Sequence, residues 1–566
     1  MKKNIKKYIG ASLFANLYKR LPLGGMGAIL LYAMMGVFSS CSDLLDQQPY
    51  GQFTSEQIDE EAAEGLLASA YAGLEAHYFG NNEAFAGPST NWIFDVRSDD
   101  AYKGGGATSM EQNIHQLEIS NLTSDNVSCL NKWQNNFYAI SRVHKAMLAL
   151  QATGNSMYFH EIAELKFLRA YYYFDLVRIF EHIPYLDENS DPNTVSNQEY
   201  SQADIYGFIC ADLEDAYDGM YEKRPSDGRV SRNAAAALHA KVSAQMNDWV
   251  AVEKWAKIVI DCGEYQLYEN YLDMSKIKYD NTYESILAIQ CSTANNNAHI
   301  NWSNLLNTTY SAGNLFGTGD DFFLGSQNLV NAFRTDANGL PYLDGAPDDE
   351  NVTSDFEGNV DPRLDFTVGR IGIPFRGYTY TKDWCRAYDL YGEYSGKKGL
   401  ISPDSDEATR EWPWGCSGLN FCLIRYADII LLYAESLIEQ NKNLDEARQY
   451  INMVREKADR SVNPDYAPVD IDPINVNYKV GLYSSKNWTQ TYARKAVRME
   501  RRLELAMEGQ RWFDLVRWGV VTETMNNYFK SESKIRSYLS GAQMSDDEIY
   551  LPTPLDEITN SNGLYK

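Results

Sequence analysis

The chain carries two blocks of helical periodicity, residues 55–264 and 420–520, separated by a long stretch that lacks it. Within the blocks, apolar residues recur every three or four positions, as Leu165, Leu168 and Tyr172 do. Amphipathic helices of this kind hide their apolar faces by packing against one another. Short polar turns favour paired hairpins, although no fixed repeat length can be counted. The sequence therefore predicts a mostly α-helical fold of irregular, tetratricopeptide-like hairpins, in which residues 161–180, 424–440 and 494–518 are helical.

The stretch between the helical blocks, residues 265–420, is rich in Gly, Asn, Asp, Tyr and Trp. Long irregular segments inside a folded protein are more often functional than merely connecting. Because the helical layer then comes from two distant pieces of chain, we expect one composite domain over residues 41–566. In this domain residues 265–420 form a loop-rich, ligand-binding region against the helices, and residues 521–566 form a C-terminal segment.

Aromatic residues are unusually frequent: Tyr 40, Phe 22 and Trp 11 make up 13% of the 566 residues. The Tyr hydroxyl seeks water or a partner, so this excess favours aromatic side chains at a wet surface. Acidic residues outnumber basic ones by 77 to 51, which gives a net charge of −26. A negative field of that size disfavours nucleic acid and other polyanions, so a neutral ligand is expected.

Residues 1–40 have the pattern of a lipoprotein signal peptide. Basic residues up to Arg20 precede an uncharged run, Leu21–Phe38, and the small pair Ser39–Ser40 comes directly before Cys41. A transmembrane anchor is the alternative, since a run of this length nearly spans a bilayer. The Pro and Gly residues within the run favour the signal peptide. After cleavage, Cys41 would be the lipid attachment site, where several acyl chains together give stable anchoring.

The sequence contains no HExxH, no GxSxG, no phosphate-binding loop and no dinucleotide fingerprint. Its Cys and His residues lack the spacing of a zinc site. We therefore expect no enzyme, no metal and no cofactor. Two questions stay open: whether Cys416 and Cys422 form a disulfide, and whether Asp320–Asp321 or Asp348–Glu350 hold a calcium ion. The spacing of these acids favours solvated loops instead.

The segment Glu500–Gly519 interleaves charged and apolar side chains. Glu500, Glu504 and Glu508 lie four residues apart, and such a like-charge row weakens an isolated helix. Nearby Arg residues favour a partly buried ion-pair network that joins the two helical pieces. A glycosidase-like carboxylate pair at Glu504 and Glu508 is the alternative, but Arg neighbours would keep both acids ionised. The expected pairs are Arg501–Glu504, Glu508–Arg511 and Asp514–Arg517.

Eight sequence blocks lie in order along residues 41–566. They are CSDLLDQQP from Cys41, ELKFLRAYYYFDLVRIFEHIPY from Glu164, GRVSRNAAAALHAKV from Gly228, DPRLDFTV from Asp361, LIRYADIILLYAES from Leu423, LDEARQYINMVREKA from Leu444, ERRLELAMEGQRWFDLVRWG from Glu500 and YLPTPLDEI from Tyr550. Together they resemble the SusD/RagB family of outer-membrane nutrient-binding lipoproteins, with Thr553 where Ile is usual. Ser42 and Asp43 resemble the signal that sends lipoproteins to the cell surface.

The resemblance implies a non-enzymatic receptor that binds oligosaccharide at the cell surface. It also implies a partner, a SusC-like TonB-dependent barrel of the outer membrane, over which the lipoprotein closes as a lid. A RagB-like peptide receptor is the first alternative, a surface glycosidase is a less favoured one, and a scaffold that binds only the barrel is the third. The resemblance does not name the glycan.

Neutral sugars present a C–H face and a fringe of hydroxyls, which aromatic rings with flanking Asp, Asn or Arg side chains can bind. Two segments have this composition, and the resemblance implies that the first contributes to the glycan site. The predicted ligand-binding residues are Asn91, Trp92, Arg97, Asp99, Asp100 and Tyr102 in the first segment, and Trp302 and Tyr310, among Asn301, Asn304 and Asn307, in the second. Trp412 and Trp414 are weaker candidates. Each Trp has a core role as its alternative, so Trp92→Ala or Trp302→Ala should abolish binding with thermal unfolding nearly unchanged if that Trp is a platform.

Overall fold

The computed structural model describes residues 58–566, with gaps at 76–86, 155, 295–298, 311–315, 317–318, 348–349, 410–414 and 462–475. The predicted signal peptide, Cys41, Asp348–Asp349, Trp412 and Trp414 lie outside the described residues. The described part forms 17 α-helices and three two-stranded sheets, which confirms the mostly α-helical fold.

The bounds of the helices are α2 (Glu60–Tyr71), α3 (Trp92–Val96), α4 (Gln112–Glu118), α5 (Val127–Ala152), α6 (Phe159–Val177), α7 (Gln202–Gly219), α8 (Arg232–Gln245), α9 (Trp249–Asp261), α11 (Gln327–Ala332), α12 (Arg363–Thr367), α13 (Tyr388–Tyr391), α14 (Tyr426–Glu439), α15 (Leu444–Ser461), α16 (Gln490–Leu505), α17 (Arg511–Arg517), α18 (Val521–Glu532) and α19 (Leu555–Asn560).

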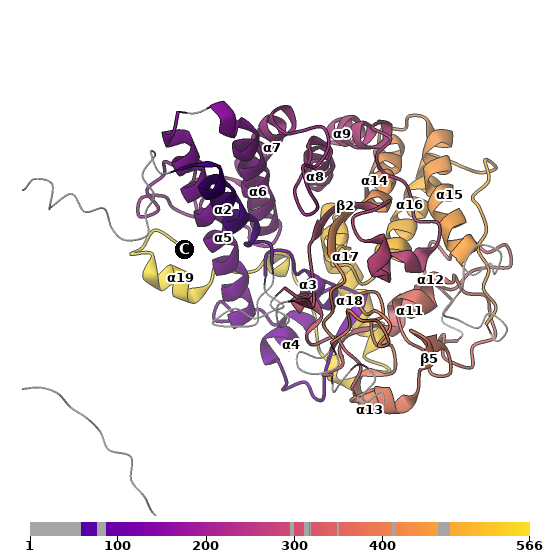
Figure 1. The fold of residues 1–566 in the computed structure, drawn as a ribbon. Helices are drawn as coiled ribbons and strands as arrows, with labels where there is room; N and C mark the ends of the chain where they lie inside the picture. The colour runs from indigo at the N-terminus through magenta and orange to yellow at the C-terminus, as the bar shows by residue number, and fades with distance from the viewer. Residues whose placement is uncertain are drawn as a thin grey trace, which may run out of the picture. The chain divides into compact units, whose positions relative to one another are not determined.

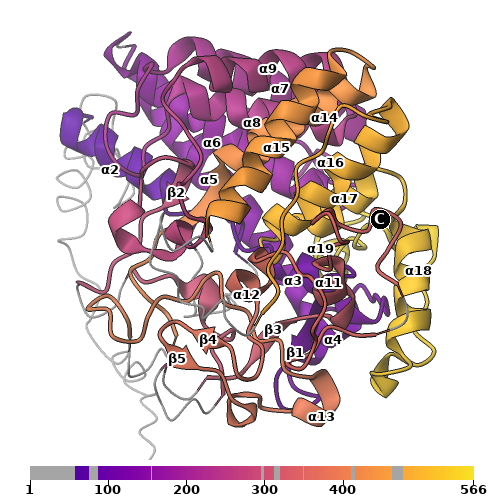
Figure 2. The ribbon, with the colours of Figure 1, turned by 90° about the vertical axis from the view of Figure 1, so that its right-hand side faces the viewer.

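The longer helices form one layer in which each packs against the next. The contacts run from α2 to α5 and through α6, α7, α8 and α9 to α14, which packs against both α15 and α16. In Figures 1 and 2 this layer lies above the strands and short helices of the loop-rich region. The two sequence-distant helical pieces therefore meet where α9 contacts α14.

Polar side chains begin several helices of the layer. At the start of α5, Asn126 Oδ1 accepts the Cys129 N–H at 3.2 Å. At the start of α7, Ser201 and Asp204 cap each other's backbone N–H groups reciprocally. Asp248 accepts the Ala251 N–H at the start of α9. Each cap satisfies a donor that has no partner inside its own helix, so these boundaries are set locally.

Three antiparallel strand pairs hold the loop-rich region to the layer and to itself. They are β1 (Ala101–Gly104) with β3 (Phe322–Gly325), β2 (Ser285–Ile289) with β6 (Phe421–Arg425), and β4 (Pro374–Phe375) with β5 (Tyr378–Thr379). The β2–β6 pair brings together the two ends of the loop-rich region, just before α14 begins. The expected helical start at Ile424 is therefore wrong, because Ile424 and Arg425 pair as strand residues.

The expected helical stretch Arg494–Trp518 is interrupted. Between α16 and α17, Met507 and Gly509 have φ angles of 61° and 74°, in the left-handed region that ends an α-helix. A Cβ at Gly509 would lie 2.8 Å from the Cβ of Asn91, so only glycine fits at this turn without displacing its neighbour. Glu508 consequently projects from the turn between the two helices.

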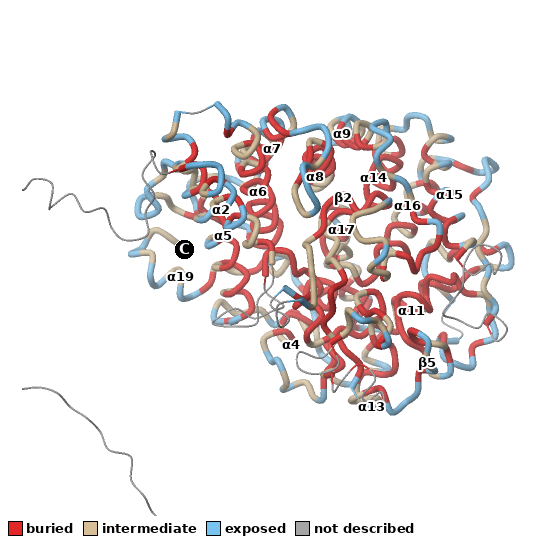
Figure 3. Tube along the Cα trace, in the orientation of Figure 1, coloured by how far each residue is buried: buried red, intermediate tan, exposed pale blue. Residues whose placement is uncertain are grey.

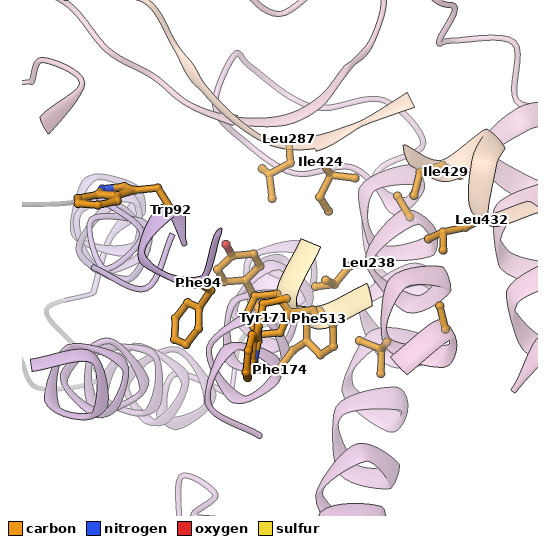
Figure 4. Packing of buried hydrophobic residues seen from close by; sticks show 14 of the residues in the cluster. Trp92, Phe94, Tyr171, Phe174, Leu238, Leu287, Ile424, Ile429, Leu432 and Phe513 are labelled. Atoms are coloured by element: carbon orange, nitrogen blue, oxygen red, sulfur yellow. The ribbon is translucent and has the colours of Figure 1, made fainter. Parts of the chain in front are cut away.

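Apolar side chains from both helical pieces share one core. The buried residues follow the inner faces of the layer in Figure 3. Figure 4 shows Phe94, Phe174 and Phe513 gathered in this core, and the rings of Phe94 and Phe513 are 5.3 Å apart. A second, smaller cluster lies in the loop-rich region, where Phe375 and Tyr380 stack at 5.4 Å. The loop-rich region is thus packed around apolar residues of its own.

Candidate functional site

A buried network of ion pairs joins the loop-rich region to the second helical piece. Glu504 of α16 accepts hydrogen bonds from Lys457 at 2.7 Å, Arg425 at 3.1 Å and Arg363 at 3.3 Å. Burial alone would raise the pKa of the Glu504 carboxyl, but the three cations outweigh burial and hold it below its ordinary value. Because Arg363 comes from α12 and Arg425 from β6, this carboxylate fixes three distant segments to one another.

The expected ion-pair network is confirmed, but two of its three expected pairs are replaced by others. Arg517 contacts Asp514 at 2.8 Å, as expected. Arg501, however, pairs with Asp428 of α14 at 2.7 Å, and Arg511 pairs with Asp99 at 2.8 Å. The helix break and the packing of distant segments bring these carboxylates closer to the guanidinium groups than the neighbours along the chain.

A cavity of about 120 Å³ borders this network. Its lining is Asn91, Trp92, Met274, Asn301, Ser303, Asn304, Asn307, Phe323, Gly396, Lys398, Gly399, Leu400, Leu419, Asn420, Phe421, Cys422, Arg425, Met507 and Glu508. Five Asn amides and three aromatic rings thus face one space. This combination of flat apolar surface and paired hydrogen-bonding groups is the one that neutral sugars need.

Two of the cavity amides have hydrogen-bonding capacity left over. The Asn301 side chain donates to the Leu419 carbonyl at 3.3 Å, and the Asn307 side chain donates to the Ser303 carbonyl at 3.4 Å. The Oδ1 atoms of both side chains are buried and have no hydrogen-bond partner among the described residues. Leaving a buried acceptor unpaired costs about 1–3 kcal/mol. A ligand hydroxyl that donated a hydrogen bond to one of these oxygens would remove that cost and so make binding more favourable.

The charged side chains that line the cavity pair with one another. Glu508 accepts hydrogen bonds from Arg425 at 2.8 Å and from Lys398 at 2.6 Å. Burial would raise the pKa of the Glu508 carboxyl, but these two cations keep it below its ordinary value. Glu504 and Glu508 are therefore both ionised at neutral pH, and neither holds the proton that a glycosidase acid must donate.

Asn91 and Trp92, predicted as binding residues, lie together in this cavity. Asn91 Oδ1 accepts a hydrogen bond from Lys132 at 3.0 Å, which fixes the amide. Trp92 is 6% exposed and packs against Phe323 with ring centroids 5.3 Å apart. In Figure 4 the Trp92 ring lies apart from that of Phe94, which comes from the same short helix, and both side chains belong to the main core. Trp92 thus has both a packing role and a place in the cavity wall.

The other predicted residues of the first segment lie outside the cavity lining. Arg97 stacks on Trp512 at 4.0 Å and donates to the backbone of Ile549. Asp99 and Asp100 pair with Arg502 and Arg511, and the Tyr102 hydroxyl donates to Glu532. These contacts tie the segment to α16–α18. A ligand-binding role for Arg97, Asp99, Asp100 and Tyr102 stays a prediction.

Only some of the predicted residues of the second segment line the cavity. Asn301, Asn304 and Asn307 line the cavity, whereas Trp302 is 6% exposed and packs in a small cluster with Ile300, Leu305 and Cys416. Tyr310 is 38% exposed, and the Arg386 guanidinium lies 5.2 Å from the centre of its ring. The binding roles of Trp302 and Tyr310 therefore also stay predictions. Of the residues named from this segment, only the three Asn line the cavity, and Ser303 lines it beside them.

Several lining residues were not predicted. Phe323 and Phe421 lie in or beside β3 and β6, Lys398 and Gly399 come from the loop before residue 400, and Met507 belongs to the turn after α16. No composition signal marks them, because each stands in a different sequence segment. The Gly-rich character of residues 265–420 pointed to the neighbourhood of Phe323, Lys398 and Gly399, but not to Phe421 or Met507.

The candidate calcium acids at Asp320–Asp321 have protein partners. Asp320 pairs with Arg386, while Asp321 accepts the Ser395 hydroxyl at 2.6 Å and the Arg386 N–H at 2.9 Å. Burial raises the pKa of the Asp321 carboxyl to about 6. Among the described residues no group of three or more His, Cys, Asp or Glu side chains could hold a metal ion. Cys416 and Cys422, the possible disulfide partners, are free thiols.

The stability of the protein should depend on pH through Asp321. Its folded pKa of about 6 lies above the roughly 3.9 of an unfolded Asp, so the folded form keeps a proton that the unfolded form loses. Its stabilisation is therefore present below about pH 4 and is lost as the pH rises toward 6, by up to roughly 3 kcal/mol. Urea denaturation from pH 4 to 8 should show a larger fall in the wild type than in Asp321→Asn. Part of the fall remains in the variant, because burial also raises the pKa of the Asp280 carboxyl to about 6. An equal fall in both proteins would contradict the prediction.

The described part of the chain has no helix that is both long and apolar enough to cross a membrane.

Known relatives match nearly the whole chain. A SusD-like protein of Bacteroides ovatus is 24% identical over 90% of this chain and 86% of its own length. A solved SusD superfamily protein of Bacteroides vulgatus has a TM-score of 0.67 at 20% identity, covering 90% of this chain and 98% of that one. Surface glycan-binding protein A of Bacteroides thetaiotaomicron, solved in complex with laminarihexaose, has a TM-score of 0.66 at 18% identity, covering 89% and 98%. At such identities the structures show a shared fold.

Two family models match consecutive parts of the chain. One, described as starch-binding and associating with the outer membrane, matches residues 43–243. The model of the SusD family matches residues 283–566, which is half of the chain, and includes the ion-pair network and most of the cavity lining. On this match, the chain belongs to the SusD family.

Proposed function

We propose that this protein is a non-enzymatic surface lipoprotein, anchored to the outer membrane through Cys41, that captures neutral oligosaccharide and closes as a lid over a SusC-like TonB-dependent barrel. The observation that carries the binding role is the cavity in which Asn301 and Asn307 offer unpaired amide oxygens beside the rings of Trp92 and Phe421. A sugar ring there can place its C–H face on an aromatic ring and give its hydroxyls to the amides.

The charges around the cavity support a neutral ligand. Its two cations, Lys398 and Arg425, are already paired with Glu508, so a charged sugar would find no free counter-ion among the described lining residues. The fold shared with a protein solved in complex with laminarihexaose makes that oligosaccharide the first probe.

Affinity electrophoresis of the mature, non-acylated protein through gels that contain neutral polysaccharides tests the proposal. Retardation by one polymer, followed by calorimetry with its oligosaccharide, would establish glycan binding. If no polymer retards the protein, the peptide-receptor alternative takes first place, and mass spectrometry of the natively purified complex would identify its cargo. Reducing-sugar release from the bound glycan would instead indicate a glycosidase.

Replacing Asn301 and Asn307 together by Ala should weaken glycan binding by about tenfold or more, because two hydrogen bonds of about 0.5–1.5 kcal/mol each are lost. Titration calorimetry with the retained oligosaccharide measures this change. Tyr138→Ala, which removes a ring that is 61% exposed on α5 and outside the cavity, is the control and should bind like the wild type. Unchanged affinity of the double variant would exclude this cavity as the binding site.

The partnership with a barrel has its own test. Purification of the acylated protein from detergent-solubilised outer membrane should yield a SusC-like barrel in stable complex with it. Recovery of the protein alone, under conditions that preserve other barrel complexes, would contradict the proposed role as a lid. It would not bear on the proposed binding of glycan.

A further inference from the structure

A second cavity, of about 190 Å³, lies where α16 faces α17 and the start of α18. It is lined by Leu343, Lys495, Arg498, Met499, Arg502, Arg511, Leu515, Trp518, Val520 and Thr524. Four of these side chains are cationic, and no Asp or Glu occurs among the described lining residues. In a protein with a net charge of −26, a cavity whose charged lining is entirely positive is a local exception.

The cations converge because of helix geometry. Lys495, Arg498 and Arg502 are three and four residues apart on α16, so they project from one face of the helix. The turn at Gly509 then redirects the chain, and α17 brings Arg511 to the same space. The helix break described above is therefore what completes the cationic lining.

Two of the four cations are neutralised by buried carboxylates. Arg502 contacts Asp100 at 2.8 Å and Asp99 at 3.1 Å. Arg511 pairs with both oxygens of Asp99, at 2.8 and 2.9 Å. Lys495 pairs with Asp344, whose side chain is 80% exposed, so water and salt screen that contact.

Arg498 has no carboxylate of its own. The nearest one, Glu439, lies 3.9 Å away and is already held by Arg494 through two hydrogen bonds of 2.7 Å. The Arg498 Nε is buried and has no hydrogen-bond partner among the described residues. Its guanidinium lies 4.8 Å from the centre of the Trp518 ring, which holds the side chain at the cavity wall. Burial also lowers the pKa of Arg498, as expected for a cation that lacks a close counter-ion.

We propose that this cavity binds one oxyanion group, a carboxylate or a sulfate, through Arg498 and Lys495. Guanidinium and ammonium groups bind such anions by charge-assisted hydrogen bonds. Arg502 and Arg511 hold the buried end of the cavity, and Leu343, Met499, Leu515 and Val520 offer apolar walls to the body of the ligand. The site differs in place and in chemistry from the neutral-sugar cavity, so it stands whether or not glycan binding is found there.

Calorimetry of the full mature protein with sodium sulfate, sodium glucuronate and glucose, each at constant ionic strength, tests the proposal. Saturable binding of sulfate or glucuronate, with none by glucose at this site, is expected. Tighter binding of glucuronate than of sulfate would assign the anion to a sugar acid, and the reverse order would assign it to a free or esterified sulfate. Absence of saturable binding by both anions would overturn the proposal.

Arg498→Gln should weaken anion binding by about tenfold or more, because a charge-assisted contact is lost, while Arg498→Lys should retain part of the affinity. Arg448→Gln is the matched control, since it removes one positive charge from α15, outside the cavity lining, where Arg448 pairs with the 74% exposed Asp445. If Arg498→Gln and Arg448→Gln lost equal affinity for the anion, only the overall charge of the protein would act on it. That result would overturn the proposed site. Binding of a neutral polysaccharide should be the same in all three variants.

Discussion

Glu504→Ala is expected to lower the free energy of unfolding by about 3–5 kcal/mol, the usual cost of breaking a buried ion pair from one side. Its carboxylate is fully buried and receives hydrogen bonds from Lys457, Arg425 and Arg363. Removing it would leave three cations in a dry interior with one acceptor fewer. Urea denaturation followed by circular dichroism measures the change.

A surface carboxylate provides the comparison. Asp261 pairs with Lys257 at 2.5 Å one turn away on α9, but both side chains are more than two-fifths exposed. Asp261→Ala should therefore cost no more than about 1 kcal/mol. If Glu504→Ala were as stable as Asp261→Ala, the network would not hold the two helical pieces together. Should Glu504→Ala fail to fold, Glu504→Gln, which keeps the shape and loses the charge, would give a measurable intermediate loss.

Acid should also destabilise the wild-type protein, as the Glu504→Ala substitution does. The pKa of the Glu504 carboxyl lies below its ordinary value in the folded protein. The stabilisation that it gives is therefore complete above the unfolded pKa of about 4.3 and is lost as the pH falls further. This loss has the opposite sign to that of Asp321, whose contribution disappears as the pH rises.

Trp92→Ala is expected to cost about 3–5 kcal/mol of stability, the range for truncating a buried Trp, and to abolish ligand binding as well. The ring is 6% exposed, packs on Phe323 and forms part of the cavity wall. Thermal unfolding and affinity electrophoresis of the same preparation measure both effects. This expectation replaces the one from the sequence, in which loss of binding would leave stability nearly unchanged.

Two variants separate the roles of Trp92. Trp92→Phe keeps an aromatic ring and should recover most of the stability, while binding stays weaker because the ring is smaller. Phe159→Ala truncates an aromatic side chain that is 57% exposed at the start of α6, and should change neither property. A Trp92→Ala protein with wild-type stability would show that the ring is not part of the core.

The helical layer could be predicted closely because its signals are local. The sequence predicted a helix over 161–180, and α6 spans Phe159–Val177. Periodicity of apolar residues and polar caps act within a few positions, and both are visible in the sequence. The turn after α16 was missed because the single Gly509 is an ambiguous signal inside a helical pattern, and Met507, which also adopts a positive φ, is a residue type that gives no sign of it.

The candidate site could be predicted only in part. Asn91, Trp92 and Asn301 stand in segments whose composition suits sugar binding, and the structure places them in one cavity. The same composition included Asp99 and Asp100, which pair with Arg502 of α16. The same polar residue types occur whether the side chain binds a ligand or holds two segments of the chain together. Only the three-dimensional structure separates them, because it shows which of these side chains line the cavity.

The ion-pair network also sets an order of events during synthesis. Arg363 is synthesised 141 residues before its acceptor Glu504, which at about 5–20 residues per second is an interval of roughly 7–28 s. Helices α5–α9 contact their sequence neighbours and can form in that time, since local contacts close fast. The ion-pair network of the loop-rich region cannot be completed in that time. Arg363 already has Asp361 and Arg425 already has Glu284, but the acceptor that they share, Glu504, is made only with α16. The contact between the loop-rich region and α16 is therefore among the last that the nascent chain can make.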